Sequence, residues 1–260
     1  YITDEYLKPY AIFKNDMKDT YVDEMEICSE FEEGIVKQEF QVFYQPVVDA
    51  RTGKIVSAEA LVRWLHEQKG WISPGQFIPA LEKGGYISQL DRYMIEKVTG
   101  CLNQRRTEEK RFVPVSVNLS WMDFYDENML EWIVRGLKKN NQNEQKIRFE
   151  ITETSLAAIG ENHTRMLTHL KENGAEILLD DFGSGYSSFG MLQDYDFDIL
   201  KMDISFVRNI GVNKKSESIL RAIIDMAHQL EIRLVAEGAE TEEQVAFLRE
   251  NGCDYIQGYY

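Results

Sequence analysis

Short β-rich runs alternate with helix-length segments from Glu39 to the end of this 260-residue chain. The alternation limits the fold more than any other feature, because strands joined by helical crossovers run parallel within one sheet. Eight runs predict strands, over residues 40–48, 55–63, 113–119, 147–151, 176–180, 199–202, 232–236 and 255–257. Helices are predicted over residues 74–83, 89–106, 128–139, 156–173, 216–230 and 242–251. Such a chain folds as a barrel or as an open doubly wound sheet.

The number of strands favours the barrel, and about 250 residues is an ordinary length for a barrel of one domain. The first two runs are joined only by residues 49–54, which suffice for a hairpin but not for a helical crossover. We therefore predict an α/β fold, a modified TIM-type (β/α)8 barrel whose first strand is antiparallel. Because the chain stops just after the last run, we expect its closing C-terminal helix to be truncated.

The first 35 residues differ in character from the rest of the chain. Apolar residues recur there at three- and four-residue steps among many acids: Met17, Tyr21, Met25, Cys28, Phe31 and Ile35. This spacing predicts an amphipathic connecting helix. Since the chain begins with Tyr1 rather than Met, we expect residues 1–35 to be a linker or the tail of a preceding domain. Residues 36–260 are expected to form the barrel domain.

Composition excludes several classes of protein. A net charge of −15 disfavours a protein that grips duplex DNA by neutralising phosphates. A phosphate-bearing substrate must then be small and must meet a locally positive site, which bound cations can provide. The three cysteines form no CxxC pair, and no apolar run reaches the ~18 residues of a membrane span. We expect a cytoplasmic domain, and the full-length protein could still be anchored to a membrane through other regions.

The chemistry is predicted at the strand ends, since barrel enzymes carry their reacting groups at the C-terminal ends of strands. Oxygen-bearing side chains recur there, namely Glu59, Asn118, Glu150, Asp180, Asp181 and Glu237. Without a cation these groups would repel one another. Hard oxygen ligands suit Mg2+ or Mn2+, and paired acids can bridge two such ions ~4 Å apart. The pattern therefore predicts a site in which two divalent cations face a phosphate.

Eight sequence blocks stand in order between Glu39 and Tyr260. They are Tyr44-Gln45-Pro46, Glu59-Ala60-Leu61-Val62-Arg63-Trp64, Val117-Asn118-Leu119-Ser120, Glu150-Ile151-Thr152-Glu153, Asp180-Asp181-Phe182-Gly183-Ser184-Gly185, Leu200-Lys201-Met202-Asp203, Glu237-Gly238-Ala239-Glu240 and Gln257-Gly258-Tyr259. In these blocks the chain resembles the EAL-domain family, the phosphodiesterases of bacterial cyclic di-GMP signalling. The resemblance implies metal-dependent hydrolysis of cyclic di-GMP to the linear dinucleotide pGpG.

The resemblance also implies a role for each site residue. One metal would be held by Glu59, Asn118, Glu150 and Asp180, and the second by Asp180, Asp181 and Glu237. Lys201 would orient the attacking water and Glu237 would help to deprotonate it. The substrate would be contacted by Gln45, Leu61, Arg63 and Gln257, while Asp203 and Gln257 would support the metal ligands. Glu153 would anchor the loop over residues 180–188, so that Glu237, Lys201, Asp203 and Glu153 form the expected catalytic set.

By the same resemblance we expect two Mg2+ or Mn2+ ions, inhibition by Ca2+, a homodimer, and an upstream sensory or GGDEF domain. Ala239 departs from the family, which more often has valine there. Two alternatives stay open. The first is a receptor that binds cyclic di-GMP without cleaving it, which usually lacks a metal ligand. The second is a barrel glycosidase with two glutamates, which the Asp180-Asp181 pair and Asn118 fit poorly.

Overall fold

A computed structural model describes residues 15–139, 147–159, 163–185 and 188–259. The chain divides into two compact units. The smaller unit comprises Tyr1–Gln41 and Arg63–Ile87, and the larger comprises Val42–Val62 and Ser88–Tyr260. Among the described residues, none of the helices combines the length and the apolarity needed to cross a bilayer.

The sheet closes into a barrel, as predicted. Its strands are β1 (Phe40–Asp49), β2 (Ile55–His66), β4 (Val115–Asn118), β5 (Ile147–Thr152), β6 (Glu176–Phe182), β7 (Ile199–Met202), β8 (Arg233–Ala239) and β9 (Tyr255–Gly258). They lie in the order β1-β9-β8-β7-β6-β5-β4-β2, and a pairing between β1 and β2 closes the ring. Strand β1 runs antiparallel to β9, with Val47 opposite Gln257. Each pair of neighbouring strands along the ring from β2 through β4 to β9 is parallel. The predicted antiparallel first strand is therefore confirmed.

Strand periodicity builds the barrel interior in layers. Val47, Leu178, Ile199 and Val235 are buried together in one apolar cluster inside the larger unit. Side chains two residues apart on a strand point to the same face, so the next layer toward the C-terminal ends consists of the residues that follow at that spacing. These residues are Gln45 on the antiparallel β1 and Asp180, Lys201 and Glu237 on the parallel strands. An apolar floor thus lies directly beneath a polar layer at the barrel mouth.

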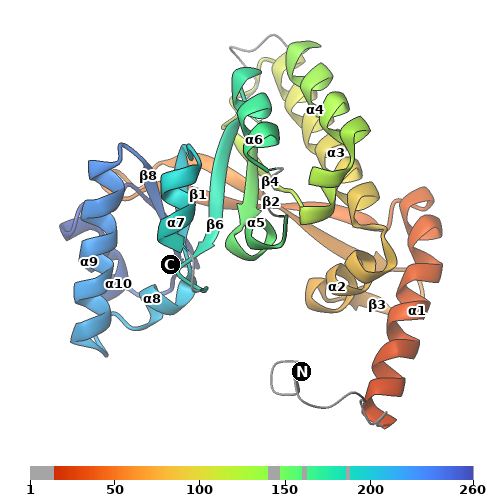
Figure 1. Cartoon of the computed structure of the whole chain (residues 1–260), viewed down its shortest axis with the longest axis horizontal. Helices are drawn as coiled ribbons and strands as arrows, with labels where there is room; N and C mark the ends of the chain where they lie inside the picture. The colour runs from red at the N-terminus through yellow and green to blue at the C-terminus, as the bar shows by residue number, and fades with distance from the viewer. Residues whose placement is uncertain (1–14, 140–146, 160–162, 186–187, 260) are drawn as a thin grey trace. The chain divides into compact units, whose positions relative to one another are not determined.

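Helices follow most strands of the larger unit (Figure 1). They are α3 (Ile87–Thr107), η1 (Trp121–Tyr125), α4 (Glu127–Lys139), α5 (Glu153–Ile159), α6 (His163–Glu172), α7 (Ser188–Asp194), α8 (Ile204–Arg208), α9 (Lys214–Gln229) and α10 (Glu242–Glu250). The predicted single helix over 156–173 is wrong, because the structure has α5 and α6 there. Helix α5 begins early since the Thr152 hydroxyl accepts the backbone N–H of Ser155 at 3.1 Å and caps it.

The smaller unit has an aromatic core. It contains α1 (Asn15–Val36), α2 (Pro74–Gly84) and the hairpin partner of β2, β3 (Gly70–Ile72). The Phe40 and Trp64 rings lie 4.6 Å apart, and Phe77 meets Trp64 edge-on at 5.7 Å. The Trp64 indole N–H donates to Glu39 Oε2 at 2.9 Å, so this buried ring has its polar group satisfied.

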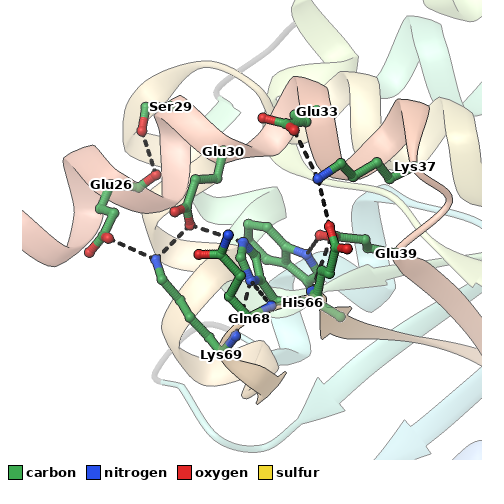
Figure 2. Close-up of polar contacts among 11 residues, drawn as sticks. Glu26, Ser29, Glu30, Glu33, Lys37, Glu39, His66, Gln68 and Lys69 are labelled. Carbon is green, nitrogen blue, oxygen red and sulfur yellow. Dashed lines mark hydrogen bonds and ion pairs between the residues drawn. The ribbon is translucent and has the colours of Figure 1, made fainter.

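Helix α1 is fixed to the β2–β3 hairpin by polar contacts, which Figure 2 shows. Lys69 Nζ lies 2.9 Å from Glu26 Oε1 and 2.6 Å from Glu30 Oε2. His66 Nδ1 accepts the backbone N–H groups of Gln68 and Lys69, which leaves Nε2 to carry a proton, 3.4 Å from Glu30 Oε2. These contacts set the position of α1 along the hairpin.

The predicted N-terminal helix is present as α1, but its buried face differs from the prediction. Phe31 is fully buried, whereas Met25 is 57% exposed and Ile27 is buried instead. The buried positions Ile27, Phe31 and Gly34 follow one another at steps of four and three residues. Met25 lies off this face, so its place in the predicted apolar stripe is wrong.

Candidate active site

Four carboxylates from four strands surround one lysine at the barrel mouth. Lys201 on β7 is 2% exposed, and its Nζ lies 2.6 Å from Glu150 Oε2 and 2.7 Å from Glu237 Oε1. The same nitrogen is 3.2 Å from Glu59 Oε2 and from Asp180 Oδ1. The strands β2, β5, β6 and β8 therefore bring together side chains that are up to 178 residues apart in the sequence. Their convergence is what the strand-end pattern predicted.

The charges of this cluster do not balance. Burial raises the pKa of Glu150 to about 8, and the charges of Glu59 and Asp180 add to that rise while Lys201 opposes it. Burial also raises the pKa of Glu237 to about 7. Although burial acts to lower it, the pKa of Lys201 is raised well above its usual value by the surrounding carboxylates. One buried cation thus faces four acids, and two of these acids tend to keep their protons.

A bulge at the end of β6 turns two consecutive aspartates toward the same site. The pairing of β6 with β7 shifts register between Leu179 and Phe182, and Asp181 adopts a left-handed backbone with φ of 56°. Consecutive strand residues normally point to opposite faces, so the bulge is what re-aims the Asp181 carboxylate. The pKa of Asp181 is raised by burial and then by the neighbouring Asp180 charge.

The donor set fits divalent cations. Asp180, Asp181 and Glu237 each present a ligand oxygen within 4.8 Å of the others. Asn118 joins the cluster through its Nδ2, which donates to Glu59 Oε1 at 3.3 Å. Carboxylate and amide oxygens are the ligands that Mg2+ and Mn2+ prefer, and the excess negative charge is what such ions neutralise.

A cavity of about 310 Å³ opens over these groups. Its lining includes the predicted substrate residues Gln45, Leu61 and Gln257. Gln257 Nε2 donates to Glu59 Oε2 at 2.6 Å, and its buried Oε1 finds no hydrogen-bond partner among the described residues. Arg63 belongs to the smaller unit; along β2 it shares a face with Glu59 and Leu61, because these residues are spaced by two.

Two of the predicted catalytic residues lie around the cluster rather than in its centre. Asp203 Oδ1 accepts the N–H of Ser205 at 2.9 Å and caps α8, and its charge also contributes to the raised pKa of Asp181, after burial and Asp180. Glu153 Oε2 accepts the N–H of Gly183 at 3.3 Å, so it holds the start of the loop that follows β6. Residues 186–187 of the predicted loop lie outside the described residues.

Five cavity-lining residues received no role in the sequence analysis: Ile204, Gly238, Glu240, Gly258 and Tyr259. All but Ile204 belong to the sequence blocks that carry the family resemblance, so membership of a block was the available signal. Gly238 has φ of 74°, and a Cβ there would lie 2.1 Å from Ile204 Cγ1. Only glycine fits this close approach of β8 to α8 without rearrangement.

Comparison with known proteins identifies the family to which the chain belongs. The model of the EAL domain matches residues 29–260. The chain belongs to the EAL domain family. Curated relatives of this EAL chain include the cyclic di-GMP phosphodiesterase NbdA of Pseudomonas aeruginosa, 32% identical over 91% of the chain. The probable cyclic di-GMP phosphodiesterase PdeG of Escherichia coli is 34% identical over 84% of it.

The EAL chain spans only part of these relatives, 30% of NbdA and 43% of PdeG. A further relative, the bifunctional diguanylate cyclase/cyclic di-GMP phosphodiesterase MucR of Pseudomonas aeruginosa, is 29% identical over 96% of the chain and 36% of its own length. Among solved structures, the PaMucR phosphodiesterase in complex with c-di-GMP superposes with a TM-score of 0.81 at 29% identity. That similarity covers 90% of the EAL chain and 94% of the solved chain.

Proposed function

We propose that this EAL chain hydrolyses cyclic di-GMP to linear pGpG with the aid of two Mg2+ or Mn2+ ions. The observation that carries the proposal is the buried cluster in which Lys201 faces the carboxylates of Glu59, Glu150, Asp180 and Glu237. An excess of buried acids is costly unless further cations compensate it. The named activities of NbdA and PdeG, and the c-di-GMP complex of PaMucR, support the same substrate.

The residues present divide into two ion-binding groups. Glu59, Asn118, Glu150 and Asp180 would hold one ion, while Asp180, Asp181 and Glu237 would hold the other. Bound ions would supply Lewis acidity and lower the pKa of a water ligand.

The side chains themselves would accept the proton of the attacking water and hold the site in place. Glu237, whose pKa burial raises to about 7, can accept a proton from the attacking water near neutral pH. Lys201 keeps its positive charge and holds the surrounding carboxylates in place. Glu153 would keep the loop after β6 over the site through Gly183.

Substrate recognition would fall to the residues that were predicted to contact the dinucleotide. Gln45, Leu61 and Gln257 line the cavity and would contact the substrate there. Arg63 would bind a phosphate through its planar, charged guanidinium group. Asp203 and Gln257 would in addition support the ligand groups, as the contact of Gln257 with Glu59 suggests.

We also propose a regulatory context for the domain. Helix α1 would connect it to an upstream sensory or GGDEF domain, which the bifunctional relative MucR supports, and the active form would be a homodimer.

The proposal is tested by incubating the purified chain with cyclic di-GMP and Mn2+ or Mg2+ and following pGpG by chromatography. Turnover that needs the ions and stops with a chelator supports the proposal, whereas turnover that survives chelation refutes the metal requirement. Tight binding without turnover would instead establish the receptor alternative.

A further inference from the structure

Two buried aspartates meet at one backbone N–H group just beyond the end of β4. Asp91 on α3 is 8% exposed and Asp123 in η1 is fully buried. The Ser120 N–H donates to Asp91 Oδ2 at 3.1 Å and to Asp123 Oδ2 at 3.0 Å. Both oxygens therefore lie within hydrogen-bond distance of the same nitrogen. These aspartates have no part in the proposed chemistry.

Two ionised carboxylates in this arrangement would repel each other strongly. Both are shielded from water, and the neutral donors around them, among them the Ser120 N–H, offer only partial positive charge. The Ser88 side chain hydrogen-bonds with Asp123, and the nearby Asp126 adds another negative charge. The repulsion is relieved when one carboxyl is protonated and donates a hydrogen bond to the other, as in other close carboxyl pairs.

The directions of the two pKa shifts favour Asp91 as the carboxyl that holds the proton. Burial raises the pKa of Asp91 well above its usual range, and the Asp123 charge and hydrogen bond raise it further. Burial raises the pKa of Asp123 too, but there the hydrogen bond from Asp91 acts in the opposite direction. We therefore take Asp91 as the donor and Asp123 as the carboxylate.

The turn that this pair holds carries a candidate metal ligand. Ser120 follows Asn118 by two residues, and the N–H of the intervening Leu119 donates to the Glu150 carbonyl oxygen at 2.9 Å. The end of β4 is therefore fixed on one side by β5 and on the other by the aspartate pair. Asn118 in turn reaches Glu59 on the neighbouring strand β2.

We propose that Asp91 and Asp123 are positioning residues that share one proton and hold the end of β4, so that Asn118 stays directed at the metal ions. This inference rests on the proposed function, in which Asn118 is a metal ligand. When pH rises through the raised pKa of Asp91 and this carboxyl ionises, repulsion between the two carboxylates releases the Ser120 turn. The native arrangement is stable below the usual carboxyl pKa and weakens as pH rises through the raised pKa of Asp91, so the contribution of the pair to Mn2+ affinity is lost over that rise.

The test compares Asp91→Ala and Asp91→Asn with the wild-type chain by Mn2+ binding, measured by electron paramagnetic resonance without substrate. Asp91→Ala should weaken Mn2+ binding by about tenfold, as loss of an outer-shell partner does. Asn is isosteric and can donate to Asp123, so Asp91→Asn should restore most of that affinity and remove the loss of Mn2+ affinity that the ionisation of Asp91 causes. Asp225→Asn, the same change at an exposed site on α9, should match the wild type.

Infrared difference spectroscopy tests the shared proton without any metal. The wild-type spectrum minus that of Asp91→Asn should contain the C=O stretching band of a protonated carboxylic acid, because protons on Glu150 and Glu237 contribute equally to both spectra and cancel. The wild-type spectrum minus that of Asp225→Asn should lack this band. An unchanged spectrum in Asp91→Asn overturns the shared proton. If Asp91→Ala folds and binds Mn2+ as tightly as the wild-type chain does, the positioning role is overturned. Absence of metal-dependent hydrolysis in the wild type would refute the proposed function instead, and the infrared band would still report on the pair.

Discussion

Replacing Lys201 with methionine removes the cation that lies among Glu59, Glu150, Asp180 and Glu237. Methionine keeps the length and bulk of the side chain, so the change is mainly one of charge. Removing one partner of a buried ion pair costs about 3–5 kcal/mol, because the remaining charge stays uncompensated. The acids can take up protons in response, so the loss of stability should be largest at pH 8 and smaller at pH 5.

Thermal unfolding without metal measures this loss. For a domain of this size, about 1 kcal/mol corresponds to about 2–4 °C, so the Tm of Lys201→Met should fall by about 10 °C at pH 8. Adding Mn2+ should recover part of the loss, since bound ions supply the missing positive charge. Lys54→Met, at an exposed position, is the matched control and should leave the Tm nearly unchanged. A metal-free Lys201→Met protein as stable as the wild type at pH 8 would refute the charge argument.

Four further predictions follow from the site. Glu59→Ala should abolish pGpG formation while circular dichroism stays native; wild-type turnover would remove Glu59 from the metal ligands. Gly238→Ala should lower stability by about 1–3 kcal/mol in denaturant unfolding, because its Cβ would overlap Ile204; an unchanged midpoint would contradict the clash. Turnover should fall as pH drops below about 7, where Glu237 gains a proton, and a flat pH–rate profile would exclude it as the base. Calcium should inhibit turnover in Mn2+ competition assays, because its longer and looser coordination misplaces the water, and full activity with Ca2+ would contradict this.

Local patterns in the sequence were sufficient to predict the barrel and the convergence of acids at its mouth. The spacing of apolar and polar residues along a strand fixes which side chains share a face, so Glu150 and Glu237 could be predicted to meet there. The short link over residues 49–54 was sufficient to predict the antiparallel β1.

Features that depend on tertiary contacts could not be predicted in the same way. The left-handed backbone of Asp181 arises from a bulge between β6 and β7, which no local pattern reports. Asp91 and Asp123 resemble ordinary helix-start acids in the sequence, and only packing of α3 and η1 on the end of β4 buries them together. Met25 was assigned to the buried face of α1 from spacing alone, whereas α1 packs against α2 and buries Ile27 instead.

The central claim is that divalent ions neutralise the carboxylates at the barrel mouth. Anomalous scattering from a crystal of this chain soaked with Mn2+ tests it most directly. We predict two Mn2+ peaks, one among Glu59, Asn118, Glu150 and Asp180 and the other among Asp180, Asp181 and Glu237. A soaked crystal with no anomalous peak among these side chains would contradict the claim.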